Sequence, residues 1–301
     1  MEKITKAQVK LVRSLQQKKF RDELSLFVAE GEKCVSELCK AFQLEMLIIV
    51  EGLEFNQSLF SQAKTAYMLS AKRSDIEQIS SLRTPQGVIG VFKKPSHSEA
   101  VLQSEGRSYS VNGLTAEGGQ HLTLALDAIQ DPGNLGTIIR TCDWFGVHDI
   151  FCSLDTADCY NPKVVQATMG ALARVRLHYV DLPKWLNDQT NGQMVNDQMV
   201  NIFGTLLDGQ NMYEVLQRSG LTAERSYSPK DGLTAEGGHA VIIMGNEGNG
   251  ISNEVRQFIT HPIRIPSYPK NVETSESLNV SIATAIVLAE FRRSYSGAVL
   301  Q

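Results

Sequence analysis

Residues 241–252 read VIIMGNEGNGIS, and this stretch carries the two features that decide the fold. Val241–Met244 is a short apolar run of the kind that forms a fully buried strand. Three glycines within six residues follow it directly, at Gly245, Gly248 and Gly250. Glycines permit backbone amides to surround a polar ligand closely. The sequence therefore predicts a buried strand that ends in a ligand-binding loop.

The spacing of these glycines argues against two common nucleotide-binding motifs. No Lys-Ser or Lys-Thr pair follows them, as the phosphate-binding loop of nucleoside triphosphatases requires. Their intervals also differ from those of the dinucleotide-binding fingerprint. Nucleoside triphosphates and nicotinamide cofactors are therefore disfavoured as ligands.

Working outward from this stretch, apolar runs alternate with helical patterns from residue 121 onward. The runs are Leu122–Leu126, Asp149–Cys152, Val175–Val180, Ile202–Leu207, Val241–Met244 and Ile263–Ile265, and helical stretches lie near 135–146, 162–172, 211–218, 252–259 and 277–293. Such alternation predicts an α/β domain with a mostly parallel sheet. Ligands of such sheets bind beyond the carboxyl ends of the strands. We therefore expect the chemistry in the loops after the first, fourth, fifth and sixth runs.

The loop after the first run reads DPGNLG at 131–136. Gly133 and Gly136 let the backbone approach a ligand, and Asn134 can cap the following helix. If that helix starts at Asn134, Arg140 lies about two turns along it and within reach of the loop. An ordinary turn followed by a solvent-exposed arginine is the alternative.

Polar residues also gather at the predicted start of the last helix. Ser277, Asn279 and Ser281 stand where a buried helix start prefers apolar side chains. Their hydroxyl and amide groups can bind a ligand or cap the helix. Capping alone accounts for one of the three.

Residues 1–94 show a smaller α/β pattern, and the polar segment 95–120 has the composition of a linker. We predict helices over 5–20, 33–42 and 74–80 and strands over 46–50 and 88–92.

The net charge of the chain is −4, yet residues 1–21 hold seven basic residues against the single acid Glu2, a local balance of 7 − 1 = +6. A basic segment on an acidic body permits RNA binding, although a solvated helix face is the alternative.

The 301 residues are 42% hydrophobic and 21% charged, which is typical of a globular protein. No apolar run is long enough for a transmembrane helix, and the N-terminus lacks the apolar core of a secretory signal. The five cysteines show no CxxC spacing, so neither a disulfide framework nor a structural zinc site is supported. We expect a cytoplasmic protein without a metal.

One segment is duplicated within the chain. Residues 107–119 read RSYSVNGLTAEGG, and residues 225–238 read RSYSPKDGLTAEGG. Both copies precede an apolar run, and we interpret them as surface loop insertions, where extra length costs little closure entropy.

Three blocks of the sequence together resemble a known family. Residues 130–146 (QDPGNLGTIIRTCDWFG), 241–252 and 263–289 (IRIPSYPKNVETSESLNVSIATAIVLA) resemble, in order and distance, the three motifs of the SpoU or TrmH family of RNA 2′-O-ribose methyltransferases. The resemblance covers about 121–293. It extends more weakly to 1–94, where residues 10–37 resemble the RNA-binding domain of the family's ribosomal RNA methyltransferases.

The resemblance implies a fold and an activity. Residues 121–301 would form an α/β domain with a mostly parallel sheet and a deep trefoil knot, acting as a homodimer and preceded by the small α/β RNA-binding domain 1–94. The enzyme would transfer a methyl group from S-adenosylmethionine to a ribose 2′-hydroxyl of structured RNA, with ribosomal RNA favoured over transfer RNA.

The resemblance also implies roles for particular residues. The cofactor would contact Gly245, Ile265 and Leu278, with Thr205 as a further wall. The methyl-transfer site would be surrounded by Arg140, Asn134, Glu247, Ser277 and Asn279. RNA phosphates would be bound by Lys10, Arg13, Lys18, Lys19 and Arg21.

A ribose hydroxyl is a poor nucleophile until its proton is drawn away. Arg140 is the family's candidate for this step, but a guanidinium stays protonated in proteins. We expect Arg140 to hold the adjacent phosphate and polarise the hydroxyl, while a phosphate oxygen or Glu247 assists proton removal. The loop between Pro266 and Ser277 is longer than in many relatives, and its register over 267–276 stays open.

Two other functions remain as alternatives. An oxidoreductase with a nicotinamide cofactor is disfavoured by the glycine intervals. A non-catalytic RNA-binding protein with the same fold is disfavoured because the polar residues of all three motifs are present.

Overall fold

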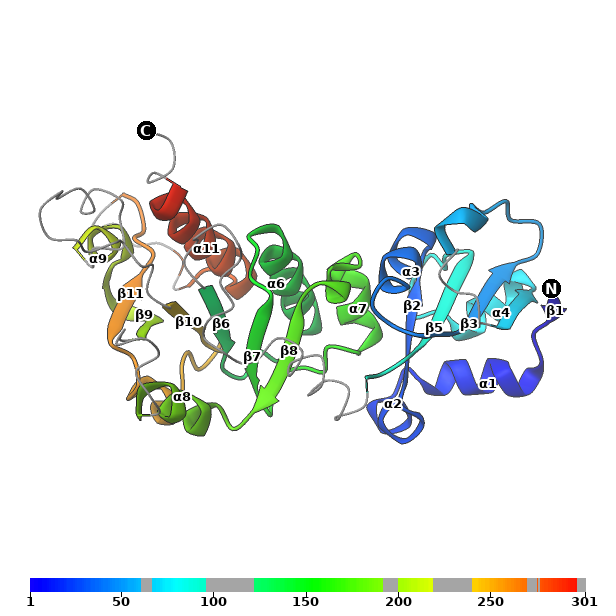
Figure 1. Cartoon of the computed structure of the whole chain (residues 1–301), viewed down its shortest axis with the longest axis horizontal. Coiled ribbons are helices and arrows are strands. Elements are labelled where there is room, and N and C mark those ends of the chain that lie inside the picture. Colours follow the sequence, from blue (N-terminus) through cyan, green and yellow to red (C-terminus); the bar gives the residue numbers. More distant parts are fainter. Residues whose placement is uncertain are drawn as a thin grey trace, which may run out of the picture. The chain divides into compact units, whose positions relative to one another are not determined.

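The computed structural model describes residues 1–60, 67–95, 122–191, 200–218, 240–269, 275 and 277–296. It divides into two compact units, and neither is a continuous segment (Figure 1). The first unit comprises Met1–Gly106, Asp131–Arg140 and Ala157–Arg176, and the second comprises Arg107–Gln130, Thr141–Thr156 and Leu177–Gln301. Both copies of the repeat, and the expected linker beyond Pro95, lie outside the described residues.

The first unit contains a mixed five-stranded sheet in the order β1-β4-β3-β5-β2. Its strands are β1 (Glu2–Lys3), β2 (Leu26–Glu30), β3 (Leu44–Val50), β4 (Tyr67–Ala71) and β5 (Val88–Lys93). β4 pairs in parallel with β1 and β3, whereas β5 is antiparallel to β2 and β3. The helices of this unit are α1 (Lys6–Ser14), α2 (Lys18–Leu24), α3 (Glu32–Leu38), α4 (Arg73–Ile79), α7 (Pro162–Thr168) and the 3-10 turns η1 (Gln57–Phe60) and η2 (Ala171–Ala173).

The single helix predicted over 5–20 is wrong, because two helices occupy this stretch. α1 begins with a capping box in which the Thr5 hydroxyl accepts from the amide of Gln8. At its end the amides of Leu15, Gln16 and Gln17 bond to carbonyls three residues back, which tightens the chain and stops the helix. Val12 and Leu15 of this stretch are fully buried in the core of the sheet.

The second unit contains a six-stranded sheet in the order β11-β9-β10-β6-β7-β8. Its strands are β6 (Leu122–Leu126), β7 (Asp149–Ser153), β8 (Arg176–Val180), β9 (Asn201–Asn211), β10 (Ala240–Met244) and β11 (His261–Arg264). The pairs β11–β9, β9–β10, β10–β6 and β6–β7 are all parallel, which confirms the predicted parallel sheet. The helices here are α8 (Leu182–Asn191), α9 (Met212–Arg218), α10 (Asn253–Arg256) and α11 (Val280–Ser296).

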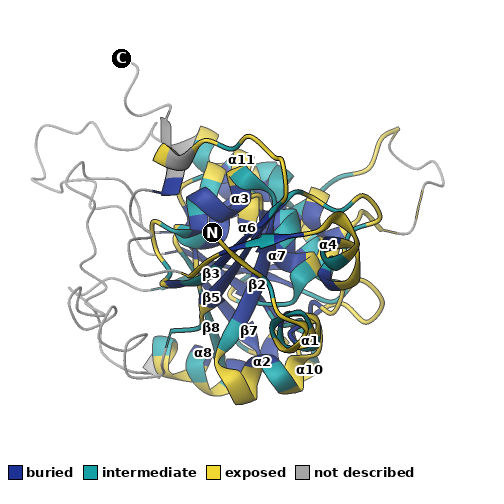
Figure 2. Cartoon of the chain, turned by 90° about the vertical axis from the view of Figure 1, so that its right-hand side faces the viewer, coloured by how far each residue is buried: buried dark blue, intermediate teal, exposed yellow. Residues whose placement is uncertain are grey.

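The core lies along the strands, which are mostly dark blue in Figure 2, while α2 carries many exposed residues. Every residue of the central strands β6 and β10 is buried. The cysteines are free thiols, and burial raises the pKa of Cys34 to about 11. Among the described residues, no helix has both the length and the apolar character needed to cross a membrane. The knot implied by the resemblance stays a prediction.

Candidate active site

The loop that follows β10 folds back on itself. The backbone amides and carbonyls of Asn246 and Gly250 pair in both directions at 2.9 Å. A Cβ atom on Gly245 would stand 2.4 Å from the backbone carbon of Gly250, a distance that real Cβ atoms do not show. Position 245 therefore requires glycine, because the closed loop leaves no room for a side chain.

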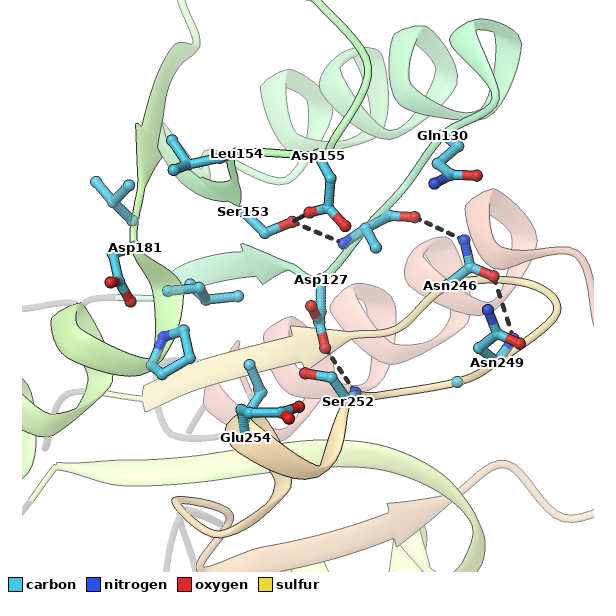
Figure 3. Close-up of a pocket in the computed structure, with 16 residues that line it drawn as sticks. Asp127, Gln130, Ser153, Leu154, Asp155, Asp181, Asn246, Asn249, Ser252 and Glu254 are labelled. Atoms are coloured by element: carbon cyan, nitrogen blue, oxygen red, sulfur yellow. Dashed lines mark hydrogen bonds between the residues drawn. The ribbon is translucent and has the colours of Figure 1, made fainter.

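The Asn246 side chain organises this loop (Figure 3). Its Oδ1 accepts hydrogen bonds from the amides of Gly248 (2.8 Å) and Asn249 (3.1 Å). Its Nδ2 donates to the carbonyl of Ala128 at 2.7 Å. One carboxamide thus shapes the loop after β10 and ties it to the segment after β6.

A second tie joins the same two segments. The Asp127 carboxylate, 5% exposed, accepts a 2.7 Å hydrogen bond from the amide of Ser252. Ala128 stands at a φ of +58°, a conformation that disfavours residues with a side chain. Its amide donates to the hydroxyl of Ser153 at 2.8 Å, so hydrogen bonds hold it on both sides. Strained residues persist only where their surroundings over-determine them, as here.

These loops border a pocket of about 460 Å³ in the second unit, shown in Figure 3. It lies at the carboxyl ends of β6, β7, β8 and β10, as the general rule for parallel sheets predicts. The polar side chains that line it are Asp127, Gln130, Ser153, Asp155, Asp181, Asn246, Asn249, Ser252 and Glu254. The sequence indicated the loops after β6 and β10 but not those after β7 and β8, which carry no glycine cluster. Among the described residues, no three His, Cys, Asp or Glu side chains are grouped to hold a metal ion.

The expected cofactor residues lie on the other half of the sheet. Thr205 is on β9, Gly245 follows β10 and Ile265 follows β11, and these three strands are neighbours. The Thr205 hydroxyl donates to the carbonyl of Ile243 at 3.1 Å, which joins β9 to β10. Leu278, just before α11, is a large apolar side chain with 50% exposure. Contact of these four residues with a cofactor stays a prediction.

The helix α6 (Pro132–Trp144) begins two residues earlier than predicted. Asp131 caps it, because its Oδ1 accepts from the amide of Asn134 at 2.8 Å, so the predicted cap at Asn134 is wrong. Gly136 also has a different role from the one expected. A Cβ atom there would stand 2.4 Å from the Cβ of Ala167, so the glycine permits close packing of α6 on α7.

The five expected residues of the methyl-transfer site are divided between the units. Asn134 and Arg140 belong to the first, whereas Glu247, Ser277 and Asn279 belong to the second. Arg140 is exposed, and no hydrogen bond or ion pair joins its side chain to another described residue. Convergence of the five residues stays a prediction.

Asn279 caps α11. Its Oδ1 accepts from the amide of Ser281 at 3.0 Å and from the Ser281 hydroxyl at 2.6 Å. Capping therefore accounts for both Asn279 and Ser281, not for one polar residue as predicted. Ser277 is exposed immediately before the cap, and Glu247 is exposed at the tip of the loop after β10.

The expected phosphate contacts differ in their availability. Lys10, Arg13 and Lys19 are exposed. Lys18 pairs with Asp22 at 2.6 Å, and Lys94 pairs with the same carboxylate. Hydrogen bonds from these two lysines lower the pKa of Asp22 to about 2.

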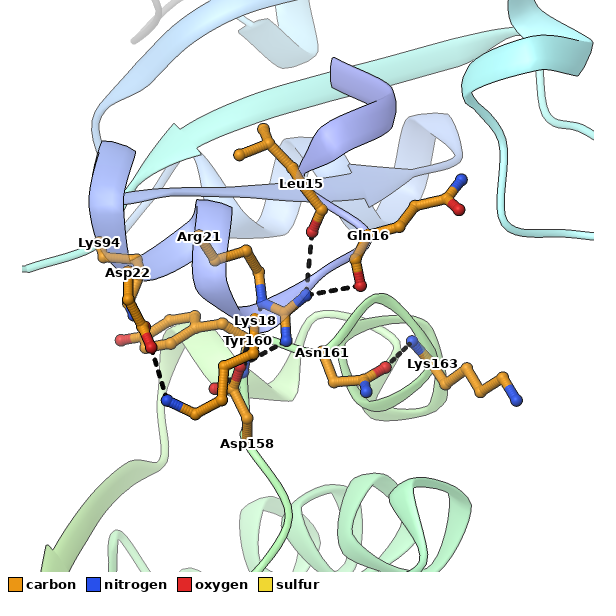
Figure 4. Close-up of polar contacts among 10 residues, drawn as sticks. All are labelled: Leu15, Gln16, Lys18, Arg21, Asp22, Lys94, Asp158, Tyr160, Asn161 and Lys163. Carbon is orange, nitrogen blue, oxygen red and sulfur yellow. Dashed lines mark hydrogen bonds and ion pairs between the residues drawn. The ribbon is translucent and has the colours of Figure 1, made fainter. Parts of the chain in front are cut away.

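The expected phosphate contact at Arg21 is wrong, because this residue is 1% exposed and cannot serve as a surface contact (Figure 4). Its Nε and Nη2 donate to Oδ2 of Asp158 at 3.1 and 2.7 Å. Its Nη1 donates to the carbonyls of Leu15 and Gln16, both at 2.9 Å. The basic pattern of residues 1–21 gave no sign that one member has a buried carboxylate partner 137 positions away.

Known proteins share both the sequence motifs and the fold of this chain. Residues 121–289 match the SpoU rRNA methylase family, and residues 6–90 match the MRM3-like substrate binding domain. A putative RNA methyltransferase of the TrmH family from Porphyromonas gingivalis shares 33% identity and superposes with a TM-score of 0.70, covering 96% of this chain and 98% of that one. An AdoMet-bound rRNA methyltransferase from Sinorhizobium meliloti shares 27% identity with a TM-score of 0.70, covering 97% of each chain.

A curated relative of nearly the same length is the 23S rRNA (guanosine(2553)-2′-O)-methyltransferase RlmP of Bacillus subtilis, 26% identical over 94% of this chain and 95% of that protein. The matched segment 121–289 exceeds half of the chain. The chain therefore belongs to the SpoU rRNA methylase family, whose members are RNA 2′-O-ribose methyltransferases. Residues 6–90 carry a domain of the MRM3-like substrate binding type.

Proposed function

We propose that this protein transfers the methyl group of S-adenosylmethionine to a ribose 2′-hydroxyl of ribosomal RNA. The observation that carries the proposal is the closed loop after β10, in which Gly245 admits no side chain and Asn246 fixes the backbone. This loop coincides with the second family motif. Relatives over the full chain, including the Bacillus and Sinorhizobium proteins, are ribosomal RNA methyltransferases by name.

The residues present fit S-adenosylmethionine. Backbone groups around Gly245 and Ile265 offer polar partners at the ends of β10 and β11, the two strands that flank β9, and the half-exposed Leu278 offers an apolar surface for an adenine ring. Thr205 lines the same edge of the sheet. The cofactor, when bound, supplies an electrophilic methyl group on a sulfonium centre.

The remaining roles belong to side chains on α6 and the loops. Arg140 is exposed and without a described partner, so its planar guanidinium is available to hold the phosphate beside the target ribose and to polarise the hydroxyl. Glu247 or a phosphate oxygen takes the proton, since the guanidinium does not deprotonate. Asn134 and Ser277 orient the ribose, together with the Nδ2 group of Asn279, whose Oδ1 caps α11.

The protein acts as a homodimer in this proposal. Two large apolar side chains in the second unit are ones that a subunit interface would cover, because Trp144 at the end of α6 is 85% exposed and Ile282 on α11 is 54% exposed. Light scattering of the wild type and of Trp144→Glu tests this directly, and a monomeric wild type would contradict it. A cytoplasmic location is retained as a prediction.

The decisive experiment is methyl transfer from labelled S-adenosylmethionine to separated ribosomal and transfer RNA from cells that lack this protein. We expect label at a ribose of ribosomal RNA with the wild type and at least a hundredfold less with Arg140→Ala, on the order of an electrostatic contact to the reacting group. Arg140→Lys separates a guanidinium role from simple charge. Label in transfer RNA alone, or no cofactor binding by equilibrium dialysis, would contradict the proposal.

A further inference from the structure

Lys163 is a basic residue far from the N-terminal cluster in sequence, yet it belongs to the same unit. It lies in the first turn of α7 and is exposed. Its amide donates to Oδ1 of Asn161 at 2.9 Å, which fixes its backbone, while its side chain extends away from Arg21 and Asp158 (Figure 4). No described side chain forms an ion pair with its ammonium group.

A short chain of hydrogen bonds places Lys163 beside α1 and α2. Arg21 of α2 bonds to the carbonyls of Leu15 and Gln16 and to the carboxylate of Asp158. The carbonyl of Asp158 accepts from the amide of Asn161, which in turn caps Lys163. The end of α1, the start of α2 and the start of α7 therefore lie next to one another, although Arg21 and Asp158 are 137 positions apart in sequence.

Aromatic packing reinforces the same junction. The ring of Tyr160 lies 4.8 Å from that of Phe27 and 6.3 Å from that of Phe42, measured between centroids. The ammonium group of Lys94 lies 5.3 Å from the centre of the Tyr160 ring. Residues 158–163 are thus held to the N-terminal sheet by both charge and packing.

The balance of charge at this surface favours an anionic partner. The carboxylates of Asp158 and Asp22 are already paired, the first with Arg21 and the second with Lys18 and Lys94. The helices α1, α2 and α7 also carry exposed cations for which the described residues show no ion pair, namely Lys10, Arg13, Lys19 and Lys163. On α2 the exposed acid Glu23 is the side chain that opposes them.

We propose that Lys163 binds the phosphate backbone of the substrate RNA together with Lys10, Arg13 and Lys19, and that Arg21 and Asp158 are positioning residues for this surface. The inference rests on the proposed function, which makes RNA the polyanion that the enzyme must hold. Part of the RNA-binding surface is then supplied by the middle of the chain, not by residues 1–94 alone. Contacts of this kind set affinity and salt dependence, not sequence choice.

Equilibrium binding of the full chain to ribosomal RNA from cells lacking the protein tests Lys163. We expect Lys163→Gln to weaken binding roughly three- to tenfold and to reduce the slope of log K against log salt by about 0.7 to 0.9, the loss of one phosphate contact. Lys184→Gln, an exposed lysine of α8 in the second unit, is the matched control and should leave both unchanged. Glu23→Gln should tighten RNA binding, an effect opposite in sign to that of Lys163→Gln.

The outcomes separate the inference from the function on which it rests. A wild type that transfers methyl groups to ribosomal RNA, with Lys163→Gln binding as tightly as Lys184→Gln, overturns the inference alone. A wild type that neither binds nor methylates ribosomal RNA overturns both. A salt-independent loss of binding would also overturn it, because phosphate contacts release counterions.

The positioning role needs its own readout. Asp158→Asn keeps the shape of the side chain but removes the charge, and we expect a higher KM for RNA with kcat within about twofold of the wild type. Adding Lys163→Gln to Asp158→Asn should cost less than Lys163→Gln alone, because the two act together. Arg21→Lys, which keeps a charge but loses the planar set of donors that reaches Asp158 Oδ2 and the two carbonyls, should lie between the wild type and Asp158→Asn. Full additivity of the two substitutions in folded protein overturns the positioning role.

Discussion

The side-chain amide of Asn246 donates a 2.7 Å hydrogen bond to the carbonyl oxygen of Ala128, which joins two loops 118 positions apart in sequence. The same side chain closes the loop after β10 by accepting two backbone amides. A single carboxamide therefore sets both the shape of this loop and its place at the end of the sheet.

Replacement of Asn246 tests this arrangement. Asn246→Ala leaves the Ala128 carbonyl and two loop amides without their partner, and we expect a loss of about 1–3 kcal/mol in the free energy of unfolding. Asn246→Asp keeps the acceptor but places an anionic oxygen against the Ala128 carbonyl, so methyl transfer should fall in both variants. Urea unfolding and turnover measure the two effects. Asn249→Ala is the control, and equal effects in Asn249→Ala and Asn246→Ala would contradict the assignment.

The strain at Ala128 predicts opposite effects of a smaller and a larger residue. A left-handed conformation costs a residue with a Cβ about 1–2 kcal/mol, so Ala128→Gly should leave the stability unchanged or raise it by up to about 1 kcal/mol. Ala128→Val, which is β-branched, should lower it by about 1–3 kcal/mol. Thermal unfolding of the two variants provides the comparison. A stabilised Ala128→Val would show that the backbone here is not strained.

Loss of the Arg21–Asp158 ion pair should lower the free energy of unfolding more than the replacement of a surface lysine does. Arg21→Met leaves the Asp158 carboxylate partly buried without its cation, and breaking a buried pair in this way costs about 3–5 kcal/mol. Lys19→Met on the same helix should change the free energy of unfolding by less than about 0.5 kcal/mol. Denaturant titration distinguishes them, and similar midpoints would argue against a structural role for the pair.

The lowered pKa of Asp22 predicts that this residue makes a small contribution to the free energy of unfolding that is lost in acid. Its pKa is lowered from 3.8 to about 2 in the folded protein by hydrogen bonds from Lys18 and Lys94. A carboxyl whose pKa is lowered stabilises the folded state above its unfolded pKa, and this contribution disappears as the pH falls from about 4 to about 2. The Asp22 side chain is 44% exposed, so solvent screening limits the effect to less than about 1 kcal/mol. Asp22→Asn should flatten the dependence of stability on pH in this window, and an unchanged slope would contradict the prediction.

Much of the second unit was predictable because its strands are continuous apolar runs. Leu122–Leu126 coincides with β6, and the predicted run at 241–244 lies within β10. The edge strand β2 of the first sheet was not predicted from the sequence. β2 was missed because Leu26–Glu30 follows a helix directly, separated only by Ser25 in a left-handed conformation, with no glycine or proline to mark the turn.

The candidate site was predictable where glycines mark close backbone approaches, as at Gly245. It was not predictable where side chains act over long sequence separations, because pattern analysis reads only local neighbours. The hydrogen bond from Asn246 to Ala128 and the burial of Arg21 by Asp158 are both of this kind. Gly136 shows the converse, since a glycine next to a candidate ligand loop serves the packing of two helices.

The first unit is built from segments that are far apart in sequence, and this has a consequence for synthesis on the ribosome. Residues 1–95 leave the ribosome before residues 157–176, which complete the packing around Phe27 and Phe42. At about 5–20 residues per second, the intervening stretch takes roughly 4–16 s to make. During that interval the nascent N-terminal sheet exposes an aromatic face, and the partner of Arg21 has not yet been translated. A chaperone that binds exposed aromatic surface would meet its target at this stage, and truncation before residue 176 would leave that target permanently open.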